Sequence, residues 1–190
     1  SDAALENLYL IWNKQLEIEG LNLSENDYTT ICFELVVKGY HKLQRILEEQ
    51  YTRINDPERK ARFEFIKPAL SHEPVIREQF FGNMQNEKFR EKEPWVITAM
   101  SYFNHPLRAN QSVQYIQPSL QLLEELQITG DIFFPKQWLD AVFSGHSSSD
   151  AVVEINLFLN GNPAYPANLR NKILQSTDMV FRSSIIKKDD

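Results

Sequence analysis

Apolar residues recur at three- and four-residue spacings along nearly the whole chain, and this period predicts helices. The first apolar stripe, Leu5, Leu8, Tyr9, Trp12 and Leu16, is typical of a helix of about four turns. Later stripes keep this period and are separated by Gly, Pro, Asn and Ser. The pattern predicts about ten helices, near residues 5–16, 24–39, 43–54, 57–70, 73–81, 94–103, 113–130, 135–145, 147–161 and 166–180.

Local signals set the ends of these helices. Ser24 stands three residues before Asp27, a variant of the capping box, and Pro57 suits a first helical turn. Pro68 should kink or end the helix in which it lies, because proline has no N–H to donate. Gly130 is expected to end its helix as a left-handed cap.

The order of the elements predicts an all-α fold. Only residues 132–134 could form a brief extended segment. Short links place consecutive helices antiparallel, and no single amphipathic helix can bury its apolar face alone. We therefore expect one domain over residues 1–190, built of stacked antiparallel helix pairs as an α-solenoid of the HEAT kind, although the repeats show no fixed period.

Composition and charge narrow the classes of partner. The hydrophobic fraction of 42% favours a packed core. The net charge is −6, and glutamates are interleaved with the basic residues between 53 and 92, so no continuous basic surface for binding nucleic acid is expected. Cys32 is the only cysteine, which excludes an intrachain disulfide. No apolar run reaches the ~18–20 residues that would span a bilayer. Because the first residue is Ser1, we expect a processed or excised piece of a longer chain.

The histidines form no recognisable metal or acid–base motif. A zinc hydrolase helix needs two histidines one turn apart with a glutamate between them, and His72-Glu73 is followed by Ile76 at the second position. We therefore predict neither catalytic nor metal-binding residues in this chain. The other histidines, expected at the surface or at helix caps, are His41, His105 and His146.

Four residues are candidates for lining a cavity. Phe133, Phe134 and Trp138 are large aromatics within six residues, a grouping that builds either a core plug or the wall of a cleft, with the core favoured. Arg108 follows His105-Pro106 at a helix end, where it could cap a helix, pair with a carboxylate or line a concave face.

Four stretches are more specific together than any one motif. They are Asn55-Asp56-Pro57-Glu58-Arg59 with Arg62-Phe63 and Pro68-Ala69-Leu70-Ser71; Glu93-Pro94-Trp95-Val96 with His105-Pro106-Leu107-Arg108; Gly130-Asp131-Ile132-Phe133-Phe134-Pro135 with Trp138-Leu139-Asp140; and Asp178-Met179 with Phe181-Arg182. From about Asp27 onward, the chain resembles the C-terminal region of zinc aminopeptidases of the aminopeptidase N family, a group of metallopeptidases, and in particular a bacterial branch.

In that family a preceding catalytic domain carries His-Glu-x-x-His and binds zinc, and a C-terminal helical array closes over the active-site cavity. The resemblance implies that this chain is that array: inactive alone and without a cofactor of its own. Its partners would be the upstream catalytic domain and the parent's peptide substrate. Arg108, Phe133, Phe134 and Trp138 would then be candidates for facing the cavity. The resemblance favours an exported bacterial parent and leaves a cytoplasmic one open.

Two other classes of function compete with this interpretation. A freestanding α-solenoid that binds a protein or peptide through its concave face would show the same helical period. An independent hydrolase has only the incomplete His72-Glu73 pair in its favour. The helical pattern alone does not separate the accessory domain from the scaffold.

Overall fold

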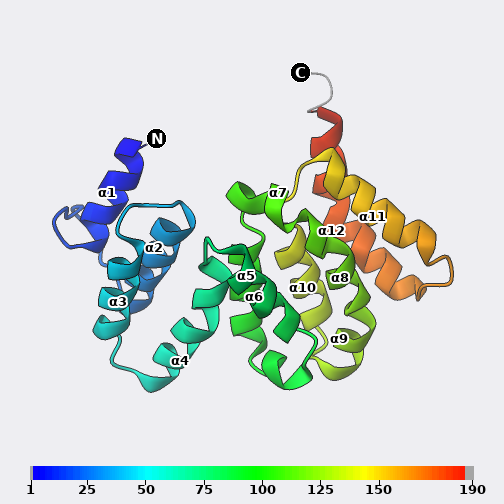
Figure 1. Cartoon of the computed structure of the whole chain (residues 1–190), viewed down its shortest axis with the longest axis horizontal. Coiled ribbons are helices and arrows are strands. Elements are labelled where there is room, and N and C mark those ends of the chain that lie inside the picture. Colours follow the sequence, from blue (N-terminus) through cyan, green and yellow to red (C-terminus); the bar gives the residue numbers. More distant parts are fainter. Residues whose placement is uncertain (1, 187–190) are drawn as a thin grey trace. The chain divides into compact units, whose positions relative to one another are not determined.

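The computed structural model describes residues 2–186, and Figure 1 shows the helices that they form. Within this range there are twelve α-helices and four short 3-10 helices, and there is no β-strand. The all-α prediction is therefore confirmed, whereas the superhelical stacking of a solenoid stays a prediction. The chain divides into two compact units, unit 1 at residues 1–80 and unit 2 at residues 81–190.

Unit 1 has helix α2 at its centre. This helix packs against α1, α3 and the 3-10 helix η1, and its Phe33 ring lies 5.1 Å from the ring of Phe63. Burial against α3, where its sulfur lies beside the carbonyl of Ile46, raises the pKa of the Cys32 thiol to about 12. The elements are α1 (Asp2–Trp12), α2 (Glu25–Val37), α3 (Leu43–Arg53), α4 (Pro57–Ile66), η1 (Lys67–Leu70) and α5 (Pro74–Asn83), the last of which crosses into unit 2.

A buried chain of hydrogen bonds joins the first three helices of unit 1. The Trp12 indole N–H donates to Gln50 Oε1 over 2.8 Å, and Gln50 Nε2 donates to Thr29 Oγ1 over 3.1 Å. Thr29 Oγ1 then donates to the carbonyl of Glu25. Each polar atom that burial takes from water thereby receives a partner, which fixes the register of α1 and α3 on α2.

The local signals in unit 1 act as the sequence predicts. Ser24 and Asp27 form the reciprocal capping box of α2, and Asp56 caps α4 ahead of Pro57. The α-helix α4 ends at Ile66 and gives way to the tighter η1 helix, which contains Pro68. The capping box, Pro57 and Pro68 act through residues close in sequence, so no distant contact was needed to predict them.

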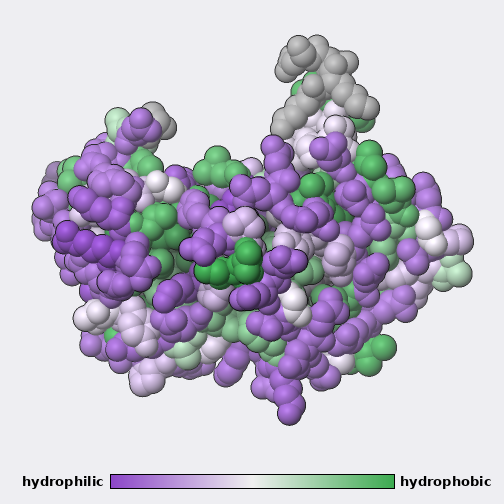
Figure 2. Space-filling model, in the orientation of Figure 1, coloured by the Kyte–Doolittle hydropathy of each residue, from purple (hydrophilic) through white to green (hydrophobic). Residues whose placement is uncertain are grey.

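Unit 2 is arranged around helix α10. Seven of the ten residues of α10 are buried, and the helix packs against α6, α8, α9 and α12 (Figure 1). On the face drawn in Figure 2, hydrophilic residues predominate and hydrophobic residues lie in separate patches. The elements are η2 (Glu87–Arg90), α6 (Glu93–Phe103), η3 (Pro106–Arg108), α7 (Ala109–Ser112), η4 (Val113–Tyr115), α8 (Ile116–Gln121), α9 (Leu123–Thr129), α10 (Phe134–Phe143), α11 (Ser149–Gly161) and α12 (Ala167–Ile186).

The structure changes two of the elements expected in unit 2. The helical segment expected at 113–130 is divided into η4, α8 and α9. Of the two roles that the sequence allows Pro118, bending this helix or marking the start of its main part, the second agrees with its place in the first turn of α8. The extended segment expected at 132–134 is a turn, in which the Phe134 N–H donates to the carbonyl of Asp131, so α10 begins at Phe134.

Two positions in unit 2 require glycine because neighbouring atoms leave no room for a Cβ, and not because the backbone is left-handed. Gly130 has φ −96° and ψ 172°, so the predicted left-handed cap is wrong. A Cβ there would lie 2.5 Å from Phe134 Cδ1 and 2.9 Å from the Leu126 carbonyl oxygen. At Gly145, a Cβ would lie 1.7 Å from the carbonyl oxygen of Asn104. Only glycine lets these segments meet.

None of the helices described between residues 2 and 186 has the combination of length and apolar character that crossing a bilayer requires. This agrees with the expectation that the sequence contains no membrane span.

The contact at Gly145 yields a stability prediction. Gly145→Ala should lower the free energy of unfolding by more than about 2 kcal/mol, because the rigid Asn104 backbone has to move away from the new methyl group. Gly161→Ala is the matched control, since a Cβ at Gly161 meets nothing within 4 Å, and it should change stability by less than about 1 kcal/mol. Urea unfolding measures both, and equal effects would contradict the close contact.

Candidate functional site

The structure separates the four residues that the sequence proposes for a cavity wall. Trp138 and Phe134 are 0% and 2% exposed, and their rings meet edge to face at 6.4 Å. The Trp138 indole N–H donates to the carbonyl of Ser119 over 3.1 Å. Both side chains therefore form the core plug, the alternative that the sequence favours, and they hold α10 in place.

Phe133 differs from these neighbours, because 68% of its surface is exposed. It belongs to the turn between α9 and α10 together with Ile132, which is 72% exposed, and Ile128 in the last turn of α9 is 83% exposed. We call Ile128, Ile132 and Phe133 the apolar corner. Sequence reasoning missed both isoleucines, although two apolar residues beside Gly130-Asp131 were a signal of an exposed turn.

The apolar corner is held by two hydrogen bonds from its own turn. The Asp131 N–H donates to Glu93 Oε1 on α6 over 2.8 Å, and the Phe133 N–H donates to Asp131 Oδ1 over 2.9 Å. These bonds fix the main chain on both sides of Ile132, so the exposed side chains project from an ordered turn. The corner can supply apolar contact area without first paying for loop ordering.

Arg108 lies in a buried polar region of unit 2, at 4% exposure. Its carbonyl accepts a hydrogen bond from the hydroxyl of Ser112, which is also buried. Ser112, Asn104 and His146 meet beside it, and we call these three residues the His146 cluster. Arg108 is therefore placed inside the fold rather than on an accessible wall.

His146 is 5% exposed, so the expectation of a surface or capping histidine is wrong for this residue. Its Nε2 lies 3.4 Å from Asn104 Oδ1 and 3.5 Å from Ser112 Oγ. The Asn104 Nδ2 group donates to the Met100 carbonyl, so Asn104 Oδ1 faces the imidazole as an acceptor. We therefore assign the ring proton of His146 to Nε2, which donates to Oδ1. Nδ1 has no hydrogen-bond partner among residues 2–186.

Burial lowers the pKa of His146 to about 4 from an ordinary value of 6.5. The ring is therefore neutral near pH 7. The Ser112 hydroxyl donates to backbone carbonyls within its own turn, and it is buried as deeply as the imidazole. The cluster thus joins the end of α6 to the segment after α10 through the Ser112 hydroxyl and His146 Nε2.

The remaining histidines are accounted for by local contacts. His105 accepts a hydrogen bond from the Leu107 N–H and caps η3, as predicted. His41 is exposed beside the Tyr40 ring. His72 Nε2 lies 2.6 Å from the carbonyl oxygen of Val36, which ties the start of α5 to α2. In the part of the chain that the structure describes, no three His, Cys, Asp or Glu residues are grouped to hold a metal ion.

Comparison of the chain with protein-family models, with curated proteins and with solved structures finds no match.

The His146 cluster predicts a specific acid sensitivity. The folded pKa of about 4 lies below the ordinary 6.5, so the unfolded chain binds the proton first as the pH falls. The stability that neutral His146 provides is complete above pH 6.5 and is lost as the pH falls towards 4, by about 3 kcal/mol in total.

Urea unfolding from about pH 7 down to about pH 4 tests this difference. His146→Gln is the matched variant, because its amide can still donate to Asn104 Oδ1 but does not titrate. The wild type should lose more stability on acidification than the variant. Parallel pH profiles for the two proteins would exclude His146 as the source.

Proposed function

We propose that this chain is a non-catalytic, C-terminal helical domain of a zinc aminopeptidase of the aminopeptidase N kind, and that it covers the active-site cavity and limits peptide entry. One observation carries the proposal: stretches that underlie the resemblance meet in space. Glu93, from the second stretch, accepts the hydrogen bond from Asp131 of the third, 38 residues away. This contact gives a physical reason for finding both stretches in one chain.

The proposed contribution to the reaction is geometric. When bound in the parent's catalytic domain, zinc would polarise the scissile carbonyl and activate water. The helical domain would exclude bulky substrates and contact the peptide away from the scissile bond, which changes the specificity. Phe133 is the candidate for such a contact, because Phe134, Trp138 and Arg108 are enclosed within unit 2.

A freestanding helical scaffold is the second candidate function. The apolar corner favours it, since two exposed apolar side chains on an ordered turn and a third at the end of α9 suit any protein partner, whether or not a peptidase precedes them. The reading frame upstream of Ser1 distinguishes the two, because a His-Glu-x-x-His helix there belongs only to the peptidase.

We expect the isolated chain to be inactive. Purified alone, it should retain no zinc after dialysis and should hydrolyse aminoacyl amides no faster than buffer, because the proposal places the metal and the general base in the parent's catalytic domain. Zinc content and amide hydrolysis are measured on the same preparation. Activity that copurifies with the chain would overturn the accessory role.

Phe133→Ala in the parent enzyme should act on long peptides only. Removing an exposed ring should raise KM for long peptides by about threefold to tenfold, and leave dipeptide hydrolysis and stability unchanged. Leu157→Ala is the matched control, since Leu157 is a 55% exposed apolar residue on α11. Unchanged kinetics on both long and short peptides would remove Phe133 from the cavity wall.

A further inference from the structure

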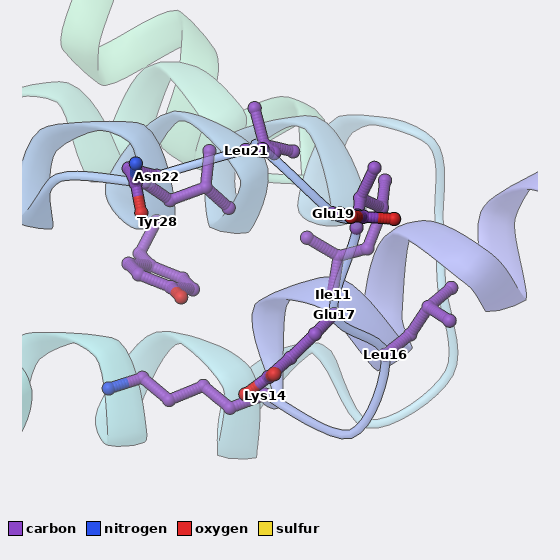
Figure 3. A pocket seen from close by; sticks show the side chains of 11 residues that line it. Ile11, Lys14, Leu16, Glu17, Glu19, Leu21, Asn22 and Tyr28 are labelled. Atoms are coloured by element: carbon purple, nitrogen blue, oxygen red, sulfur yellow. The ribbon is translucent and has the colours of Figure 1, made fainter.

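The loop between α1 and α2 lines a cavity in unit 1 that is open to solvent. Lys14 and residues 16–23 line a space of about 690 Å³, together with Ile11 on α1 and Tyr28 on α2. Figure 3 shows Ile11 on α1 beside this space and Tyr28 on α2 across it, with the loop running round between them. The apolar corner lies in unit 2, so this cavity is a separate surface.

Apolar side chains of the loop are left partly in water. Leu16, Ile18 and Leu21 are 36%, 48% and 47% exposed. By contrast, Phe33, Leu35 and Ile66 of the same unit are at most 2% exposed, so the loop does not share the burial of the core. Three such residues around one cavity are a surface on which apolar groups of a ligand would be removed from water.

The main chain of the loop also has free hydrogen-bonding groups. The Leu21 N–H donates to the Ile18 carbonyl over 3.0 Å, across a turn in which Gly20 has a φ of +80°. Within residues 2–186, the N–H groups of Glu17, Ile18 and Glu19 donate to no protein acceptor. An unpaired, non-helical main chain of this kind can pair with a peptide laid beside it.

Of the charged side chains at the cavity, Lys14 has a partner within the chain, and Glu17 and Glu19 have none among residues 2–186. The Lys14 ammonium lies 5.2 Å from the centre of the Tyr28 ring, a cation–π contact that holds it along one wall (Figure 3). Glu17 and Glu19 form no ion pair with any residue between 2 and 186. These carboxylates alternate with Leu16 and Ile18 along the chain, so acidic and apolar groups are interleaved.

We propose that this loop is a docking site for an extended segment of a separate protein in which leucine-like side chains alternate with lysine or arginine. The apolar side chains would occupy the cavity beside Ile18 and Leu21. The basic groups would pair with Glu17 and Glu19, and the segment's main chain would bond to the free N–H groups. The charge of the site selects the partner, because an acidic segment would be repelled by the same carboxylates.

Titration calorimetry with two short capped peptides tests the proposal on the whole chain. One peptide alternates leucine with lysine and the other alternates leucine with glutamate. The lysine peptide should bind saturably and the glutamate peptide should not. Glu17→Gln with Glu19→Gln should weaken binding of the lysine peptide by about fivefold to tenfold, because two exposed charge pairs are lost. Glu78→Gln with Glu87→Gln, an equal change of charge at two exposed positions on α5 and η2, should leave the affinity unchanged.

A second double variant tests the apolar contacts. Ile18→Ser with Leu21→Ser should weaken binding of the lysine peptide by at least about tenfold, because apolar contact area is lost. Circular dichroism should show unaltered helix content, because both side chains are half exposed in the free chain. Equal binding of the two peptides, or binding that neither double variant weakens, would overturn the proposal. The result is independent of the proposed aminopeptidase role, which zinc content and hydrolysis test separately.

Discussion

Unit 2 depends on enclosing α10 on almost every side. Seven of its ten residues are buried, and the only polar group of Trp138, the indole N–H, is satisfied by the Ser119 carbonyl. The narrow polar side is tied down as well, because Asp140 pairs with Lys136 and accepts a hydrogen bond from Ser176 on α12. Because the core is close-packed, a helix enclosed in this way can pack against all its neighbours in only one orientation about its axis and at one position in the core. The segments that lead into and out of it inherit that constraint.

The two glycines beside α10 are consequences of this enclosure. To place Phe134 in the core, the preceding turn has to approach so closely that Gly130 has no room for a methyl group. The same tight entry turns Phe133 out to solvent, which creates the apolar corner. On leaving α10, the chain crosses the Asn104 carbonyl at Gly145 and carries His146 into the core. The exposed corner and the buried imidazole therefore follow from a single packing requirement.

Sequence reasoning succeeded where structure is decided locally. The capping box of Ser24 and the stop at Pro68 depend on neighbours within a few residues, and the three- and four-residue period located most helices. It failed where distant residues decide. Gly130 responds to Phe134 and Glu93, and His146 to Asn104, 42 residues away. Phe133 and Phe134 are chemically identical neighbours, and only the rotation of α10 makes one a surface residue and the other a core residue.

The same packing decides which side chains are accessible for function. Cys32 is a buried thiol with its pKa raised to about 12, His146 is a buried neutral imidazole, and His72 is bonded to the Val36 carbonyl. These three side chains are thus used to join helices. The groups offered to solvent are different: the apolar corner in unit 2, and apolar residues alternating with carboxylates around the loop in unit 1. Surfaces of this composition make contacts through apolar area and charge.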